Sequence, residues 1–92
     1  MGGGVNWKNA FSRLDPTTNI FKVFVYLAFS DEPKTPKDIA TATKISPGTV
    51  RPALRSLLED YNLVDQLPDG KYVSKVSLAD IISDIYSRFL GK

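Results

Sequence analysis

The chain contains no cysteine and no histidine among its 92 residues. Without cysteine it has no disulfide bonds and no thiolate ligands for a metal ion. Without histidine it lacks Ser-His-Asp and Cys-His catalysis and the usual zinc sites. The sequence also has no glycine-rich phosphate loop. These absences predict a protein that is not an enzyme and that uses no metal or cofactor.

Long apolar runs are missing as well. No stretch of about 18 apolar residues occurs, so no membrane-spanning helix is predicted and we expect a cytoplasmic protein. Residues 1–4, Met-Gly-Gly-Gly, lack the apolar core of a signal peptide and are expected to form a flexible N-terminus. A length of 92 residues with 42% apolar content suggests one small domain over residues 5–92.

Charge is low overall but unevenly distributed. The formal net charge is +2, yet residues 34–55 hold five basic residues and only one acid, Asp38. A basic patch on a near-neutral protein suits phosphate contact by one face. Because a charge cluster alone is more often a solvated helix surface, the surrounding motif has to decide.

Five helices and one hairpin are predicted from hydrophobic periodicity and capping residues. Asp15-Pro16 indicates the start of a central helix that is apolar nearly all round, and Asn62 suits a left-handed helix end. The predicted elements are an N-terminal helix at 5–14, a central helix at Pro16–Phe29, two helices joined by a tight turn within 35–60, a hairpin at 63–76 and a C-terminal helix at 78–90.

Serine and threonine are expected to cap three of these helices. Thr35 and Asp38 form a short-armed capping box, Ser46 precedes the next helix, and Ser77 precedes the last. The helix that Thr35 opens is predicted to pack through Ile39, Ala40 and Ala42.

This order of elements predicts a mainly α protein with a small β-hairpin, an α+β winged helix-turn-helix. In TPKDIATATKISPGTVRPALRSLLEDYNLV, Ala40 allows a close helix crossing, Ile45 fills the corner, and Val50 holds the second helix to the core. A helix so placed fits the major groove of double-stranded DNA. The alternative is a winged helix that serves only as a protein-interaction module.

The run Ser46-Pro47-Gly48-Thr49-Val50-Arg51-Pro52-Ala53-Leu54 resembles the recognition helix of the PadR family over about 20 residues. The resemblance implies a winged-helix DNA-binding protein that dimerises through a C-terminal helix. Two roles stay open: transcriptional regulation, or centromere binding in plasmid partition with an adaptor and a ParA-type ATPase, as in small archaeal plasmid proteins of similar layout. The chain lacks the usual His-Gly-Tyr stretch and has a short wing without an arginine run, which puts the repressor role in doubt.

Pro52 stands where this helix should be well under way. If Ser46 caps the helix, Pro52 costs one backbone hydrogen bond, to Gly48, and the first two turns should be irregular. If residues 46–49 form a turn instead, Thr49 caps and no bond is lost. The Ser46 start fits the PadR layout better. In both cases Pro52 projects away from the core, where it suits contact with a thymine methyl group.

The expected DNA contacts follow from the side of this helix that faces away from the core. Arg51 and Arg55 are candidates for a guanine edge or a phosphate. The lysines of the preceding helix and the turn are candidates for phosphate, and those of the wing for the DNA backbone or the minor-groove edge. Tyr72 and Val76 are expected to pack inward from the wing. The full predicted set is Lys37, Lys44, Ser46, Gly48, Thr49, Arg51, Pro52, Arg55, Ser56, Lys71 and Lys75.

The terminal helices exceed what a winged-helix core needs. Because their apolar residues would otherwise form a large exposed patch, we expect a twofold homodimer on a near-palindromic DNA site. The alternative is that the last helix covers its own domain. Asp80 and Asp84 are expected on the wet side of that helix. The predicted interface residues are Trp7, Phe11, Leu78, Ile81, Ile82, Ile85, Tyr86, Phe89 and Leu90.

Overall fold

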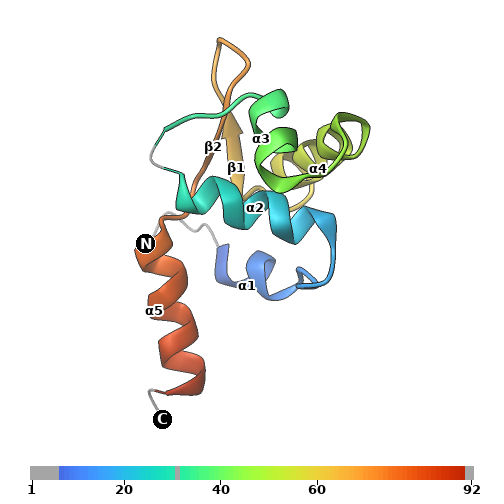
Figure 1. Ribbon diagram of the computed structural model, residues 1–92. Coiled ribbons are helices and arrows are strands. Elements are labelled where there is room, and N and C mark those ends of the chain that lie inside the picture. The colour runs from blue at the N-terminus through green and yellow to red at the C-terminus, as the bar shows by residue number, and fades with distance from the viewer. Residues whose placement is uncertain (1–6, 31, 91–92) are drawn as a thin grey trace.

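The computed structural model describes residues 7–30 and 32–90, and in them the chain is mainly helical with one two-stranded antiparallel hairpin. The predicted α+β composition is confirmed. The expected flexible N-terminus at 1–4 and the first two residues of the predicted helix at 5–14 lie outside the described residues. The elements are α1 (Trp7–Ser12), α2 (Asn19–Phe29), α3 (Pro36–Thr43), α4 (Pro47–Glu59), β1 (Val64–Gln66), β2 (Tyr72–Ser74) and α5 (Leu78–Phe89) (Figure 1).

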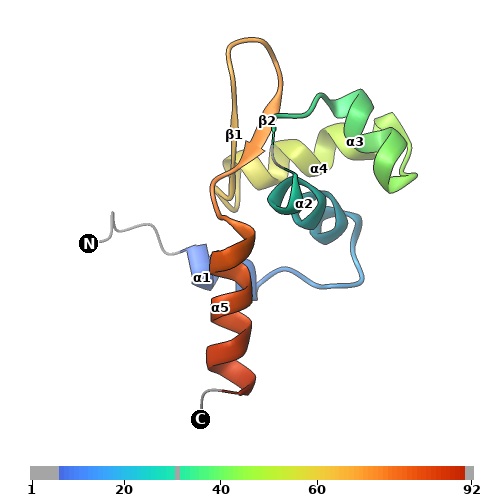
Figure 2. The same cartoon turned by 60° about the vertical axis from the view of Figure 1, so that its left-hand side comes forward.

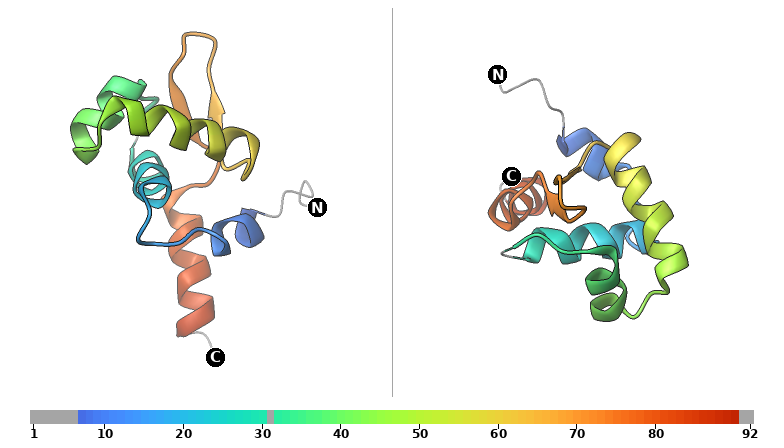
Figure 3. Two further views of the ribbon diagram at one scale, coloured as in Figure 1. Left: turned by 90° about the vertical axis from the view of Figure 1, so that its right-hand side faces the viewer. Right: turned by 90° about the horizontal axis from the view of Figure 1, so that it is seen from above.

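Helix α2 lies at the centre of the fold. Helices α3 and α4 and strand β2 pack against it, and α1 lies on its other side (Figures 1 and 3). The ring of Phe11 in α1 lies 5.7 Å from that of Phe24, which is fully buried. Helix α2 is apolar nearly all round but is not buried along its whole length, because Phe29 at its end is 60% exposed.

Helix α2 begins at Asn19 rather than at Pro16 as predicted. The carbonyl of Asp15 accepts a hydrogen bond from Thr18 N–H at 3.0 Å, which closes a turn with Pro16 at its second position. Thr18 is the true N-cap, and its hydroxyl accepts from Phe21 N–H at 3.3 Å. Asp-Pro is therefore a turn signal here, and the helix starts after the turn.

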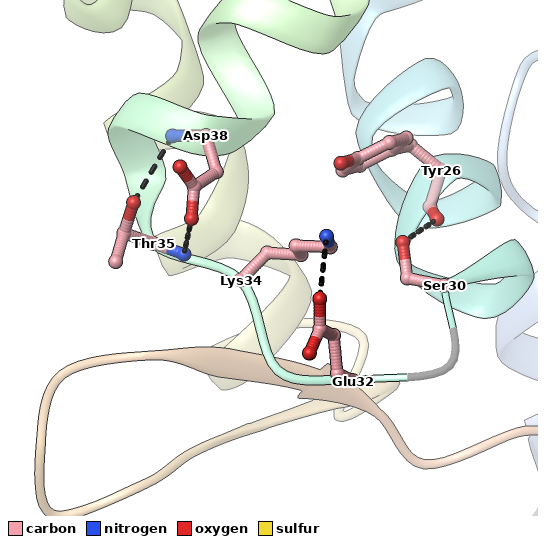
Figure 4. A network of polar contacts seen from close by, with 6 residues as sticks. All are labelled: Tyr26, Ser30, Glu32, Lys34, Thr35 and Asp38. Carbon is pink, nitrogen blue, oxygen red and sulfur yellow. Dashed lines mark hydrogen bonds and ion pairs between the residues drawn. The ribbon is translucent and has the colours of Figure 1, made fainter.

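Helix α3 starts with the predicted capping box. Thr35 Oγ1 accepts from Asp38 N–H at 3.0 Å, and Asp38 Oδ2 accepts from Thr35 N–H at 3.2 Å (Figure 4). Ile39 and Ala40 are buried as expected. The prediction for Ala42 is wrong, because this residue is exposed on the outer side of the helix.

Acid should weaken this cap. The hydrogen bonds from Thr35 hold the pKa of Asp38 below its ordinary value of 3.8. A carboxyl group with a lowered folded-state pKa contributes stability that is present above the unfolded pKa and lost as pH falls through the folded one. We expect the free energy of unfolding to fall as pH drops through 3.8 and below, and to fall less in Asp38→Asn. Urea unfolding of both proteins between about pH 7 and pH 2 measures this. Parallel pH curves would contradict it.

The turn between α3 and α4 depends on a left-handed residue. Lys44 has φ 60° and ψ 32°, and its N–H and that of Ile45 both bond to Ala40 C=O. A side chain at positive φ is uncommon and gives the chain a sharp change of direction. Ile45 is half-buried against the core, as the sequence predicts.

Helix α4 runs from Pro47 to Glu59 with Ser46 as N-cap residue, so the first of the two starts is the observed one. The helix continues without a break through Pro52. The irregularity expected in its first two turns does not interrupt it. Ser46 makes no side-chain capping bond. The carbonyl oxygen of Ser46 accepts a hydrogen bond from Thr49 N–H at 2.9 Å. Its hydroxyl donates to Thr49 Oγ1 at 3.1 Å and accepts from no backbone N–H of α4.

The hairpin follows a left-handed residue, as predicted, since Asn62 has φ 56°. Val64 pairs with Ser74 and Gln66 with Tyr72. Tyr72 also forms a bridge with Lys34, with backbone hydrogen bonds of 3.0 and 2.7 Å. This bridge ties the loop before α3 to the hairpin.

Helix α5 extends away from the rest of the chain (Figures 1 and 2). Ser77 caps it as predicted, with its hydroxyl accepting from Asp80 N–H at 3.1 Å. The expectation that Asp84 lies on the wet side is wrong, because Asp84 is only 6% exposed and its Oδ2 lies 3.0 Å from Arg88 Nε. Helix α5 thus meets its own domain through the side that carries Asp84 and Ile81.

Candidate nucleic-acid interface

The exposed side of α4 carries the central side chains of the predicted DNA-contact set. Residues on a helix are rotated by about 100° each, so Arg51 and Arg55 lie one turn apart on the same side. Both are exposed, as is Pro52, whereas Val50 and Leu54 are fully buried. Burial of the apolar side therefore fixes the direction in which α4 presents its arginines.

A groove lies between this side of α4 and the hairpin. We call it the α4–hairpin groove, and its volume is about 370 Å³. Arg51 and Arg55 line it from α4, and Gln66 and Tyr72 line it from the two strands. The complete lining is Pro36, Arg51, Leu54, Arg55, Leu58, Glu59, Gln66 and Tyr72. Both arginines are thus turned toward the hairpin.

The first turn of α4 is open to solvent. Ser46, Gly48 and Thr49 are all exposed, and a Cβ atom built on Gly48 would meet nothing within 4 Å. Backbone N–H groups at a helix start favour a phosphate. Ser56, further along the helix, is half-buried on the flank away from the groove.

Gly48 gives a prediction in which stability and binding change in opposite directions. Gly48→Ala should stabilise the protein by up to about 1 kcal/mol, because alanine is the better helix former and the space is empty. If a DNA strand approaches the first turn of α4, the same methyl group should weaken DNA binding about threefold or more. Thermal melting and fluorescence anisotropy measure the two effects. Unchanged or tighter DNA binding would show that Gly48 lies away from the DNA.

Two predicted phosphate anchors flank the same face. Lys37 is exposed in the first turn of α3, and Lys44 is exposed in the turn before α4. Lys44 lies two residues before Ser46, the N-cap of α4, and Lys37 follows Pro36, which lines the α4–hairpin groove. They extend the positively charged surface beyond the arginines.

Lys34 belongs to the basic cluster in sequence but not to this face. Its Nζ lies 3.3 Å from Glu32 Oε2, and the hydrogen bond to Glu32 raises the pKa of Lys34 (Figure 4). Beside it, Ser30 Oγ donates to Tyr26 C=O at 2.8 Å at the end of α2. These contacts stabilise the loop, and within it the charge of Lys34 is paired with that of Glu32.

The hairpin differs most from the sequence-based expectation. Lys75 Nζ donates to Asn62 Oδ1 and lies 3.6 Å from Asp65 Oδ1, so its charge is already partnered within the chain. Lys71 is half-buried beside the turn. Gln66 and Tyr72, which were not in the predicted set, line the groove instead.

The dimer residues predicted from sequence separate into two groups. Trp7 and Phe11 pack with their rings tilted and the ring centroids 6.2 Å apart. Both pack on the chain's own core, and Ile81 is buried there too. Leu78 is half-buried. The others form an exposed row that we call the α5 stripe: Ile82, Ile85, Tyr86, Phe89 and Leu90.

Comparison with protein-family models, curated proteins and solved structures gave no match for this chain. In residues 7–30 and 32–90, no helix is long and apolar enough to cross a membrane. The same described residues contain no cluster of acidic, histidine or cysteine side chains suited to hold a metal ion. The case for a function therefore rests on the face around α4.

Proposed function

We propose that this protein is a sequence-specific, dimeric DNA-binding protein of the winged helix-turn-helix type. The observation that carries the proposal is the exposed side of α4, where Arg51 and Arg55 stand beside an open groove and a hairpin. In this proposal α4 is the recognition helix, α3 crosses the DNA backbone, and the hairpin is the wing. Such a protein would act in the cytoplasm, on nucleoid or plasmid DNA, and is not an enzyme.

Each group on the face has a role in the proposed complex. Arg51 and Arg55 present the donors that suit guanine O6 and N7, and the exposed ring of Pro52 suits a thymine methyl group. Lys37 and Lys44 contact phosphates and set the orientation. Lys75 contributes less than the sequence suggests, because Asp65 and Asn62 already engage it.

The α5 stripe supports the dimer. About 100° per residue places Phe89 and Ile82 roughly a quarter turn from Ile81, which faces the chain's own core. Its own domain leaves the stripe exposed, which disfavours the alternative that α5 only covers that domain. A second copy of α5 packed on it by twofold symmetry would present two recognition helices to successive major grooves.

Fluorescence anisotropy with a random duplex and then a selected duplex tests the proposed function. We expect binding to both, with a slope of log Kobs against log salt concentration of about −3 or steeper, because several phosphates are contacted. Tighter binding to the selected duplex should persist at high salt, where base contacts dominate. Absence of binding at micromolar protein in low salt would exclude DNA binding and favour the alternative of a protein-interaction module.

Transcriptional regulation and plasmid partition use the same face, and footprinting separates them. A fixed, operator-sized footprint at all protein concentrations would favour a PadR-like regulator. A footprint that lengthens with protein concentration would favour a partition protein that coats DNA beyond its first site.

A further inference from the structure

Glu59 is the one acidic side chain in the lining of the α4–hairpin groove, as far as the described residues show. Its Oε2 lies 3.8 Å from Nη1 of Arg55, four residues earlier on α4. A carboxylate on a surface that meets DNA repels phosphates, so general affinity alone does not explain it. What distinguishes its position is the direct contact with a candidate base-reading arginine.

We propose that Glu59 is a specificity-determining residue that withholds Arg55 from DNA phosphates. The inference rests on the proposed DNA-binding function and adds a role at the same face. On random DNA the pair of Arg55 and Glu59 stays closed and carries no net charge. At the cognate site a guanine offers Arg55 two acceptors in one plane, and that bidentate contact opens the pair.

The strengths of the competing contacts support this order. The side chains of Arg55 and Glu59 are 76% and 59% exposed, and an exposed pair of this kind changes an equilibrium constant by about fivefold at most. A bidentate contact with guanine changes it by about tenfold to a hundredfold. A single screened phosphate contact gains little over the ion pair that it would replace.

Arg51 differs from Arg55 in this respect. The residue four positions after Arg51 is Arg55 itself, and the one four positions before is Pro47, so no acid stands one turn away on α4. Arg51 is therefore free to contact a phosphate on any DNA. The two arginines therefore have different roles. Arg51 supports affinity for any DNA, and Arg55 supports discrimination between DNA sequences.

Two single substitutions test the role of Glu59. Glu59→Gln keeps the size of the side chain and releases Arg55. Asp60→Asn is the matched control, because it removes the same charge from the next residue, which is exposed and does not line the groove. On random duplex DNA, Glu59→Gln should bind about three- to tenfold tighter, with a salt slope steeper by about one per protomer, and Asp60→Asn should change little.

Arg55→Ala completes the experiment in both backgrounds. In the wild-type background it should weaken binding to the selected duplex about tenfold or more. In the Glu59→Gln background it should remove the extra slope. Circular dichroism of each variant checks that the helices are intact.

Distinct results overturn the inference and the proposed function. Equal shifts for Glu59→Gln and Asp60→Asn would reduce the effect to net charge. A random-DNA slope for the Arg55→Ala, Glu59→Gln double variant that is shallower than the wild-type slope would show that Arg55 already contacts phosphate. Either result overturns the role of Glu59 while DNA binding stands. A wild-type protein that binds no DNA would overturn the proposed function itself.

Discussion

Replacing both Arg51 and Arg55 with alanine should weaken binding to the selected DNA site by about 100-fold or more. Each arginine provides a contact of about 1–3 kcal/mol if it engages a guanine, and a dimer loses both copies. The melting temperature should stay within about 4 °C of wild type, because both side chains are exposed and pack on no core residue. Fluorescence anisotropy and thermal melting measure the two quantities.

The matched control removes the same amount of charge elsewhere. Lys8 in α1 and Lys22 in α2 are both exposed, and replacing them with alanine should change DNA affinity by about threefold at most. If this control weakened binding as much as the arginine pair, the effect would come from net charge. If the arginine variant still bound the site at full strength, α4 would not be the DNA-reading helix.

Placing aspartate at both Ile85 and Phe89 should convert the proposed dimer into a monomer at about 10 µM protein. The two side chains belong to the α5 stripe, and Phe89 is 72% exposed in the single chain. Burial of each against a partner would contribute about 1.5–3 kcal/mol, which aspartate replaces with a charge that must lose its water. Light scattering gives the mass, and circular dichroism should show that the helices of the monomer are intact.

The control for this variant uses two exposed residues of the same helix that are not part of the stripe. Ser83 and Ser87 are exposed, and replacing both with aspartate adds the same charges four residues apart. This control should stay dimeric, because it keeps every apolar side chain of the stripe. A wild-type protein with the mass of one chain at tens of micromolar would contradict the dimer, and dissociation of the control would place the interface elsewhere on α5.

Local signals made several elements predictable. The capping box of Thr35 and Asp38, the cap at Ser77 and the left-handed Asn62 each depend on residues within a few positions, so the sequence alone contains the information. The start of α2 was misplaced because Asp15-Pro16 suits both a tight turn and a helix start. The structure forms the turn at Asp15–Thr18, and the following Thr18 supplies the cap of α2.

Contacts between distant residues could not be read in the same way. The bridge between Lys34 and Tyr72 joins the loop before α3 to the hairpin, and no local sequence pattern predicts it. The burial of Asp84 likewise depends on which side of α5 meets the rest of the chain. Hydrophobic periodicity predicts the apolar side of a helix but not which part of that side a neighbour covers.

In the candidate interface, the exposure of the central residues could be predicted from the sequence, and the residues at the edges could not. Arg51 and Arg55 follow from the helical period once Val50 and Leu54 are assigned to the core, and both are exposed as expected. The ion pair with Glu59 has a spacing of four residues that the sequence does display. The lining of the groove by hairpin residues depends on strand register and on packing, which sequence spacing does not fix.

Selection of bound duplexes from a random DNA pool is the most direct measurement of the central claim. The wild-type protein should enrich a near-palindromic site with guanine in each half, and the Arg51→Ala, Arg55→Ala double variant should lose that guanine preference. A wild-type pool that shows no enriched sequence after repeated rounds would contradict sequence-specific DNA binding by α4.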